Sequence, residues 1–551
     1  MSEAPIRHPE GVYRIGYEDR PGGHPMIRIL MLLAALAAAA PGPSLAQQPR
    51  PQDPRAQESR APESRPSESR PSESRPPEGR RLPPDAVTQH SLALSDGRSL
   101  AFTATAGSLA LVDEAGKLQA EIAFTAFTLP ERPRATRPVT FALNGGPGAA
   151  SAYLNLGAVG PWRLPLDGPS ISPSAAPVPL PNDETWLDFT DLVFLDPVGT
   201  GYSRAAGDDA KRYFSVDADA SVLAAAIARW LRTNDRLTSP KFYLGESYGG
   251  FRGPLIARKL QDDVGVGLSG LVLLSPVLDF GWLQPPRHNP LGDVTRLPSL
   301  AAAAIERRGG SPDPGALAEA ESYATGEYLS DLLRGPRDGA ARDRLARRVA
   351  ALTGLDPDLV RRQAGRISTG SYQRESGRAE GRVASAYDTG VTGWDPEPNA
   401  AHAGFEDPLL SAMQAPLSSA IVDLTARTLN WRVTNLRYEL LSTGVNRQWN
   451  WGSGRTPPEV VSDLRQALAL DGSLRVLVAH GYTDLVTPYF ASRLILDQIP
   501  AYGPGQRLSL AVFPGGHMFY SRQASRAALR GEALRLYEAA LAARQGSGEG
   551  R

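Results

Sequence analysis

The sequence predicts an α/β fold in which a central, mostly parallel β-sheet is interrupted by an inserted, largely helical cap. Short apolar runs are typical of strands that are buried on both faces, as strands are in parallel sheets. Helical segments alternate with these runs, and such alternation is the pattern of an α/β sheet. The apolar runs are 139–144, 191–196, 241–246 and 268–276, and the helical segments are 216–233 and 248–262.

The sheet is expected to begin with an antiparallel meander and to end late in the chain. Apolar residues alternate with polar ones from about Thr88 to Leu129, broken by short turn segments. Two further strand-like runs, 474–480 and 508–514, precede a C-terminal helix at about 524–543.

Between these two parts lies a long stretch that is rich in Ala, Arg and Glu and has helical character, with loop-like segments inside it. Strands that are needed to complete the sheet resume after it, so we expect a cap over the functional edge of the sheet and not an independent domain. The expected parts are a core of 86–280 and 435–545, a cap of 281–434 with loops at 365–375 and 393–408, and a disordered tail of 546–551.

The N-terminal region predicts export. Arg28 precedes the apolar run 29–40, and small residues follow up to Ala46, which is the pattern of a signal peptide at 26–46. The run is shorter than the roughly 20 residues of a membrane-spanning helix, so an uncleaved anchor is the less favoured alternative. Because residues 1–25 are polar, we expect Met26 to be the initiator and the protein to be periplasmic or extracellular. With the preceding residues, the signal peptide makes up 1–46, and the Pro, Ser, Glu and Arg of 47–85 predict a disordered linker.

Composition excludes several classes of function. The 551 residues include 59 basic and 59 acidic side chains, and this balance argues against a nucleic-acid or anionic-membrane partner. We expect no stable membrane insertion after signal cleavage. There is no cysteine, so disulfides, thiolate nucleophiles and Cys-ligated zinc are excluded. No metal-ligand spacing occurs, and we expect no metal and no cofactor. The oligomeric state is open.

A candidate nucleophile lies between a predicted strand and a predicted helix. The segment GESYGG (245–250) fits the G-x-S-x-G pattern of a nucleophile elbow in the context that this motif requires. Glycines at 245 and 249 allow a sharp turn that lifts the Ser247 hydroxyl above the edge of the sheet. The sequence therefore predicts that Ser247 is a catalytic nucleophile on an α/β-hydrolase fold.

The base and its partner follow from chain order. Of the seven histidines, His517 alone lies on a glycine-containing loop after the last predicted strand, where this fold places its catalytic histidine. Asp484 follows the run 474–480 and precedes His517, as the third member of the triad should. Its carboxylate would fix the tautomer of the imidazole and stabilise the imidazolium.

An oxyanion hole needs two backbone N–H groups that point at the developing negative charge. One is expected from Tyr248, the residue after the nucleophile. The other is expected from the glycine-rich loop after an earlier strand, FALNGGPG (141–148), where Gly146 is the candidate.

At these residues the sequence resembles the serine carboxypeptidase family, and specifically an exported bacterial member of it. NGGPG (144–148), FLDPVGTGYSR (194–204) and GESYGG (245–250) match in order, and Asp484 with GGHM (515–518) matches more weakly. The resemblance covers most of 88–540 outside the cap. It implies hydrolysis of C-terminal peptide bonds through an acyl-enzyme on Ser247, with peptide or protein C-termini as substrates.

The resemblance also implies a site for the terminal carboxylate of the substrate. Asn144 and Glu246 stand where the family holds that carboxylate, and contact between two carboxyl groups requires a shared proton. We therefore expect a raised pKa for Glu246 and higher peptidase activity at acidic pH. The family usually carries a second Glu, and this chain has Ala158 at the matching position.

Other functions are alternatives to a carboxypeptidase, with or without use of the predicted triad. An esterase, amidase or acyltransferase would keep the triad and change the substrate. A non-catalytic binding module is disfavoured by an intact triad. An iminopeptidase would need to recognise an N-terminal amine, and the Asn-Gly-Gly and Gly-Glu-Ser-Tyr segments point the other way. For Trp394 and the cluster 449–451, packing of the cap and lining of the pocket are both open.

Overall fold

The protein is described by a computed structural model, which places Gly79 and residues 81–129, 133–166, 172–175, 178–286, 288–400, 404–503 and 505–546. The chain divides into two units, Met1–Ser72 and Glu73–Arg551, and the first lies wholly outside the described residues. The expected signal peptide, nearly all of the expected linker and most of the C-terminal tail likewise lie outside them.

A ten-stranded sheet forms the centre of the second unit, in the order β1-β2-β3-β7-β4-β9-β10-β13-β14, with β8 beside β3. Every neighbouring pair from β1 to β7 is antiparallel, and every neighbouring pair from β7 to β14 is parallel. The strands are β1 (Ala86–Ala93), β2 (Ser99–Val112), β3 (Leu118–Thr128), β4 (Val139–Leu143), β7 (Asp191–Leu195), β8 (Arg204–Ala205), β9 (Lys241–Glu246), β10 (Gly270–Leu274), β13 (Arg475–Gly481) and β14 (Leu508–Phe513).

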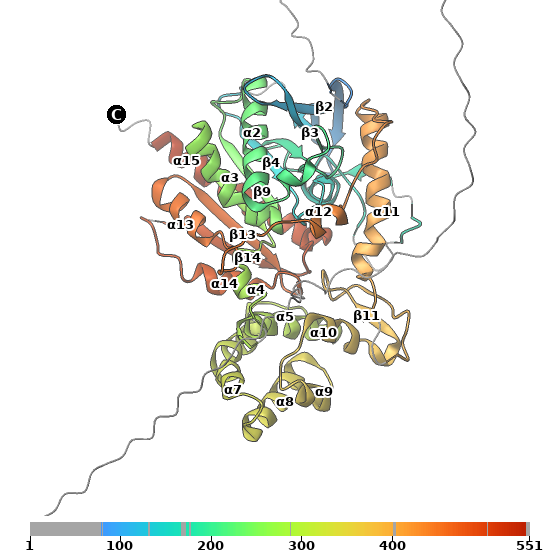
Figure 1. Ribbon diagram of the computed structural model, residues 1–551, viewed down its shortest axis with the longest axis vertical. Coiled ribbons are helices and arrows are strands. Elements are labelled where there is room, and N and C mark those ends of the chain that lie inside the picture. The colour runs from blue at the N-terminus through green and yellow to red at the C-terminus, as the bar shows by residue number, and fades with distance from the viewer. Residues whose placement is uncertain are drawn as a thin grey trace, which may run out of the picture. The chain divides into compact units, whose positions relative to one another are not determined.

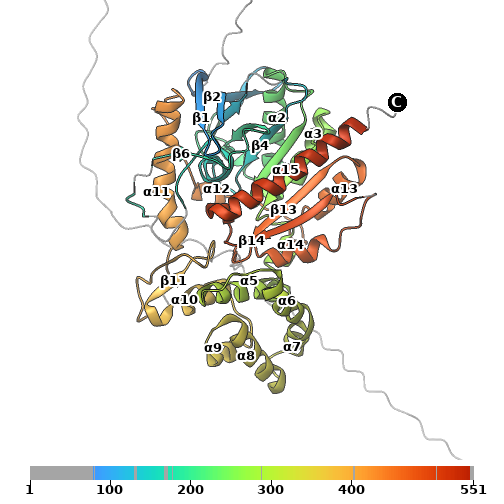
Figure 2. The same cartoon turned by 180° about the vertical axis from the view of Figure 1, so that it is seen from behind.

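Helices cover both faces of this sheet. α2 (Val216–Thr233) and α3 (Tyr248–Val264) lie on one face (Figure 1), and α15 (Gln523–Gly546) crosses the other (Figure 2). Alternate side chains of β9 enter opposite cores, because successive residues of a strand point to opposite faces. Phe242 stacks on Tyr537 of α15 at 3.8 Å, whereas Tyr243 is buried in the other cluster. The sequence prediction of an α/β-hydrolase fold is confirmed.

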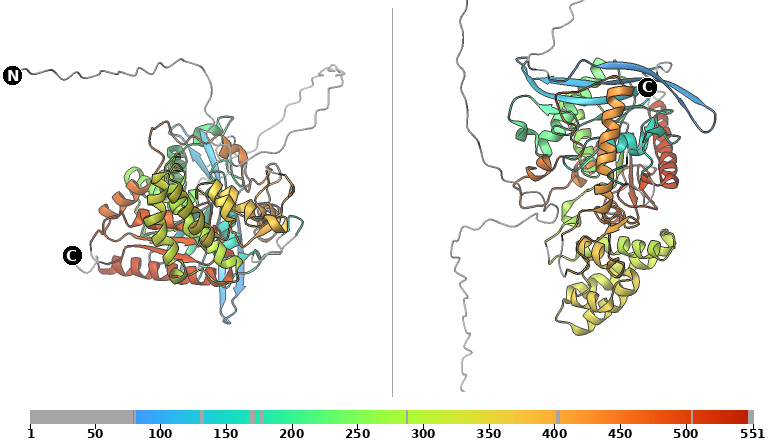
Figure 3. Two further views of the ribbon diagram at one scale, coloured as in Figure 1. Left: turned by 90° about the horizontal axis from the view of Figure 1, so that it is seen from below. Right: turned by 90° about the vertical axis from the view of Figure 1, so that its right-hand side faces the viewer.

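Helices dominate the insertion at 281–434, where α5 to α10 gather at one end of the core and α11 runs along its side (Figures 1 and 3). Its apolar cluster includes Tyr482, Leu485 and Tyr489, which follow β13, so the insertion packs directly on that loop. The elements here are α4 (Phe280–Leu283), α5 (Leu291–Arg307), α6 (Pro314–Tyr323), η3 (Ala324–Tyr328), α7 (Leu329–Arg334), α8 (Gly339–Thr353), α9 (Pro357–Arg362), α10 (Thr369–Glu375), η4 (Arg378–Glu380), β11 (Arg382–Ala384), β12 (Thr392–Trp394), α11 (Pro408–Asp423) and η5 (Leu424–Thr428).

One expectation about the insertion was wrong. The segment 365–375 was expected to be a loop, but Thr369–Glu375 forms the helix α10. Ser368 caps it, since its hydroxyl accepts a hydrogen bond from the Ser371 amide at 3.1 Å. Tyr372 is fully buried from this short helix, so tertiary packing outweighs the weak helical pattern of the sequence.

Shorter elements complete the core. They are α1 (Ala152–Leu154), η1 (Asn155–Val159), β5 (Trp162–Arg163), β6 (Leu180–Pro181), η2 (Ala210–Tyr213), α12 (Thr443–Arg447), α13 (Val461–Leu470), α14 (Tyr489–Leu496) and η6 (Phe519–Ser521). Among the described residues, no helix is long and apolar enough to cross a membrane. The same residues contain no cluster of three or more side chains suited to a metal ion.

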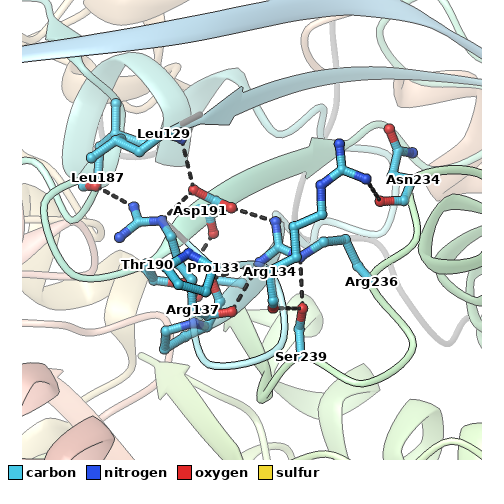
Figure 4. Close-up of polar contacts among 12 residues, drawn as sticks. Leu129, Pro133, Arg134, Arg137, Leu187, Thr190, Asp191, Asn234, Arg236 and Ser239 are labelled. Atoms are coloured by element: carbon cyan, nitrogen blue, oxygen red, sulfur yellow. Dashed lines mark hydrogen bonds and ion pairs between the residues drawn. The ribbon is translucent and has the colours of Figure 1, made fainter. Parts of the chain in front are cut away.

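A buried ion cluster fixes the amino-terminal end of the parallel strands (Figure 4). Asp191, the first residue of β7, accepts hydrogen bonds from Arg137 Nε at 2.6 Å and from Arg236 Nη1, and it also accepts one from the Leu129 amide at 3.0 Å. Each carboxylate oxygen is therefore paired, which is what a charge in this environment requires. The cluster lies at the opposite strand ends from the candidate site, so its role is structural.

Candidate active site at the carboxyl ends of the strands

Ser247 occupies a strained turn between β9 and α3. Its φ of 60° and ψ of −123° lie outside the usual region for a residue with a Cβ, and such strain persists only where the surroundings fix it. A Cβ on Gly245 would lie 2.2 Å from the Gly249 oxygen, and a Cβ on Gly249 would lie 2.4 Å from the Leu143 oxygen. Both positions of the motif therefore require glycine. Ser247 itself is half-buried and keeps access to solvent.

Asp484 and His517 form a buried pair. His517 Nδ1 lies 2.8 Å from Asp484 Oδ2, and the side chain of Asp484 is fully buried. The Thr487 hydroxyl donates to the same oxygen at 2.7 Å, while the amides of Val486 and Thr487 donate to Oδ1 at 2.7 and 2.9 Å. These donors hold the carboxylate in one orientation, with Oδ2 directed at the imidazole.

The electrostatics of this pair suit a general base. Burial acts to raise the pKa of Asp484, but the charge of His517 and the hydrogen bonds from His517 and Thr487 hold it below its usual value. Burial acts to lower the pKa of His517, but the carboxylates of Asp484 and Glu246 raise it above its usual value. The stabilised imidazolium is the form that arises when a histidine accepts a proton from a nucleophile.

Backbone contacts place this pair at the same sheet edge as Ser247. The Ser247 amide donates to the Leu274 oxygen at 2.8 Å, at the end of β10. The next residue, Ser275, donates from its hydroxyl to the His517 oxygen at 2.8 Å, and its own carbonyl oxygen lies 2.9 Å from the Thr487 hydroxyl. The end of β10 therefore lies between the Ser247 turn and the loops that carry Asp484 and His517.

The glycine-rich loop after β4 packs against the elbow. A Cβ on Gly145 would lie 2.5 Å from the amide nitrogens of both Tyr248 and Gly249, so the two backbones touch at this point. Gly146, the next residue, is exposed and has a φ of 99°, a conformation that favours glycine. The amide of Tyr248 belongs to the first turn of α3, where no carbonyl of the helix can accept from it. Gly146 and Tyr248 thus lie on adjoining segments.

Asn144 and Glu246 are joined beside the elbow. Asn144 Nδ2 donates to Glu246 Oε2 at 3.1 Å, and both side chains are almost fully buried. The other side of the Asn144 amide is fixed, because its Oδ1 accepts from the Leu154 amide at 3.0 Å. Burial raises the pKa of Glu246, which opposes the lowering by His517 and by two hydrogen bonds. This direction agrees with the expectation of a raised pKa.

Sequence reasoning missed several residues around the site. The spacing Asp484-x-x-Thr487 is typical of a turn that the aspartate side chain stabilises, so Thr487 had a local signal. No local sequence pattern indicated Tyr520, which donates a hydrogen bond to Glu246, or Tyr387 and Asp388 of the insertion. The Tyr387 ring lies edge-on to the His517 ring with centroids 5.3 Å apart.

The aromatic residues considered for the pocket differ in position. Trp449 packs edge-on against Tyr248 at 5.3 Å and is nearly buried, so it joins the segment after the insertion to the elbow helix. Trp451 contacts the same tyrosine at 5.5 Å. Trp394 is 74% exposed and lies under the guanidinium of Arg382, at the surface of the insertion.

Comparisons with known proteins match this part of the chain. Residues 101–280 match the model of the serine carboxypeptidase family. Serine carboxypeptidase-like 51 of Arabidopsis thaliana is 32% identical over 159 residues, which are 28% of this chain and 32% of the relative. The pheromone-processing carboxypeptidase KEX1 of Yarrowia lipolytica is 33% identical over 152 residues, which are 27% of this chain and 22% of the relative. The chain thus matches at most about a third of the length of these relatives.

Solved structures are more distant. The match to the juvenile hormone epoxide hydrolase of the silkworm Bombyx mori covers 80% of this chain and 79% of the silkworm chain. Its sequence identity is 13% and its TM-score is 0.33. This likeness is too weak to bear on activity, so the fold is assigned from the strand order described above. The segment that matches the serine carboxypeptidase model, residues 101–280, contains Asn144, Glu246, Ser247 and Tyr248.

Proposed function

We propose that this protein is a serine carboxypeptidase that removes C-terminal residues from peptides through an acyl-enzyme on Ser247. The observation that supports it most is the buried Asp484–His517 pair at the sheet edge where the strained Ser247 turn lies. The family match of 101–280 covers the nucleophile and the carboxylate-binding pair.

In the proposed reaction, the Ser247 hydroxyl attacks the carbonyl of the C-terminal peptide bond while His517 accepts its proton. His517 then gives this proton to the leaving amine, and the acyl group remains as an ester on Ser247. Water, deprotonated by His517, hydrolyses the ester and restores the enzyme. The amides of Gly146 and Tyr248 would stabilise the oxyanion in both steps.

Restriction to C-terminal residues would come from Asn144 and Glu246. Glu246 directly precedes Ser247, and Asn144 directly precedes the glycine loop, so a carboxylate bound by the pair would lie near the nucleophile. A substrate carboxylate and Glu246 can share this space only with a proton between them. Binding should therefore weaken as the pH rises through the pKa of Glu246.

The alternative is an esterase, amidase or acyltransferase with the same triad. Ala158 favours it, since the second carboxyl group that the family resemblance implies is absent from that position. Peptides with a blocked N-terminus distinguish the two functions, since only a carboxypeptidase shortens them stepwise from the C-terminus. Mass spectrometry should detect these products with the wild type and none with Ser247→Ala, whereas loss of an internal fragment or of the blocked end would refute the proposal.

We further propose that the protein is exported from a bacterial cell and that 281–434 acts as the cap. The support for export is the signal-peptide pattern at 26–46 with small residues before the expected cleavage site after Ala46. N-terminal sequencing of the mature protein, produced with its full leader, should find Gln47 first. A protein that keeps its leader in the cytoplasmic fraction would refute this.

A further inference from the structure

Tyr520 lies beside the candidate site and has no role in the proposed reaction so far. It belongs to the short helix η6, three residues after His517, and its side chain is fully buried. Its hydroxyl donates to Glu246 Oε2 at 2.5 Å. Its carbonyl accepts a hydrogen bond from Arg526 Nη1 at 2.8 Å, so the backbone at this position is fixed as well.

The Tyr520 ring reaches Glu246 along the helix η1 (Asn155–Val159). A Cβ on Gly157 would lie 3.3 Å from Tyr520 Cε2, so glycine at 157 leaves room for the ring. The residues of η1 are Asn, Leu, Gly, Ala and Val, and none of them is ionisable. The hydroxyl of Tyr520 therefore supplies a polar contact to Glu246 on a side where this helix offers no carboxyl group.

Both donors to Glu246 use the same oxygen. Asn144 Nδ2 and the Tyr520 hydroxyl both approach Oε2, at 3.1 and 2.5 Å. Within the part of the chain that the structure describes, no hydrogen bond is formed to Oε1. Two donors on one oxygen fix the rotation of the carboxyl group and direct the other oxygen elsewhere.

We propose that Tyr520 is a positioning residue for the terminal carboxylate of the substrate, whose hydroxyl holds Glu246 Oε2 so that Oε1 shares a proton with that carboxylate. This inference depends on the proposed carboxypeptidase function. The hydroxyl of Tyr520 stays protonated through the neutral range, and its contact then sets the pH at which Glu246 ionises.

The sign of the effect follows from the groups that face Glu246. These are the hydrogen-bond donors Asn144 and Tyr520 and the titratable side chains Asp484, His517, Tyr153 and Tyr387. Burial raises the pKa of Glu246, and the Tyr520 hydroxyl opposes this because it donates to the ionised form. Loss of the hydroxyl should therefore raise the pKa of Glu246 and extend carboxylate binding to higher pH.

Binding to an inactive enzyme tests this without interference from turnover. In a Ser247→Ala background, calorimetry would measure the Kd of an N-acetylated tetrapeptide, with a free C-terminus and as its C-terminal amide, from pH 4 to 9. For the free acid, Kd should rise above an inflection, and Tyr520→Phe should move this inflection up by about one pH unit. At pH values above both inflections the variant should bind the acid about tenfold tighter.

Tyr537→Phe is the matched control. Its hydroxyl is also buried and forms a hydrogen bond with Thr140 at 2.6 Å. Its ring stacks on Phe242, near the start of β9, whereas Glu246 ends that strand, so its removal should leave the inflection in place. If Tyr520→Phe does not fold, 3-fluorotyrosine at position 520 provides the opposite change. Its more acidic hydroxyl donates more strongly, so the inflection should move to lower pH.

The outcomes separate this inference from the proposed function. An inflection that is the same in Tyr520→Phe and in the control would overturn the role of Tyr520 while leaving carboxylate binding intact. Equal affinity for the acid and the amide at every pH, in the protein with Tyr520 unchanged, would overturn the carboxypeptidase assignment and this inference with it.

Discussion

Replacement of Asp484 by asparagine gives the sharpest test of the triad, because the structure fixes how the new amide must lie. Oδ1 of Asp484 accepts from two backbone amides, those of Val486 and Thr487, while Oδ2 faces the Thr487 hydroxyl and His517 Nδ1. An asparagine whose NH2 faced the two amides would leave buried donors unpaired, at a cost of about 1–3 kcal/mol each. Its oxygen must therefore take the place of Oδ1.

This orientation points the NH2 group of the introduced asparagine at His517 Nδ1. Nδ1 must then accept, so the proton of the neutral imidazole moves to Nε2, and Nε2 can no longer accept the proton of Ser247. In triads where this tautomer has been imposed, kcat falls by about 10⁴, which corresponds to about 5.5 kcal/mol of transition-state stabilisation. We expect a loss of the same order here, with residual activity from the oxyanion hole.

Single-turnover acylation with a chromogenic ester would measure this loss, since it does not depend on product release. The asparagine also removes the charge that raises the pKa of His517, so any residual activity should persist to lower pH than in the wild type. Asp331→Asn, at a buried carboxylate of the insertion that pairs with Arg344, is the matched control. A folded Asp484→Asn protein that loses less than tenfold would refute the triad assignment.

Three further changes test the other parts of the site. Glu246→Ala removes the carboxyl group that shares the proton and should lower kcat/KM for free-acid peptides by roughly 10- to 100-fold, from a charge-assisted bond of about 1.5–3 kcal/mol, while a neutral ester loses less than about threefold; equal losses would contradict the carboxylate role. Gly145→Ala brings a methyl group within 2.5 Å of the Tyr248 amide, so kcat should fall by about 10²- to 10³-fold for peptide and ester alike, and an unchanged kcat would exclude the glycine loop from the oxyanion hole. Asp388→Ala leaves the Arg522 guanidinium with one carboxylate fewer, so the free energy of unfolding in urea should fall by about 1–3 kcal/mol. It should also lower kcat with little change in KM, whereas a change in KM alone would assign Asp388 to substrate binding.

The sheet could be predicted from the sequence because its strands carry their own signal. Strands of a parallel sheet are apolar on both faces, and the runs at 139–144, 241–246 and 474–480 correspond to β4, β9 and β13 within a residue or two. The site could be located for a related reason. In this fold the triad members follow strand ends in a fixed chain order, so Ser247 and His517 were predicted from their position in the chain and not from their neighbours.

Contacts across the insertion could not be predicted, because they join segments with no shared periodicity. Tyr387 and Asp388 lie on a loop after β11, about 130 residues before the histidine loop that they contact. Tyr520 meets Glu246 across 274 positions of sequence. The helix α10 was missed because seven residues give too little pattern, and its stability comes from the burial of Tyr372.

These contacts join the insertion to the loop that carries His517. The His517 amide donates to the Tyr387 oxygen at 2.5 Å, and a Cβ on Gly516 would collide with that same oxygen. Asp388 accepts hydrogen bonds from both Thr483, next to Asp484, and Arg522, five residues after His517. A movement of this loop would therefore displace the imidazole. Sequence change in the insertion should then alter kcat as well as substrate preference, which a cap that only borders the substrate would not do.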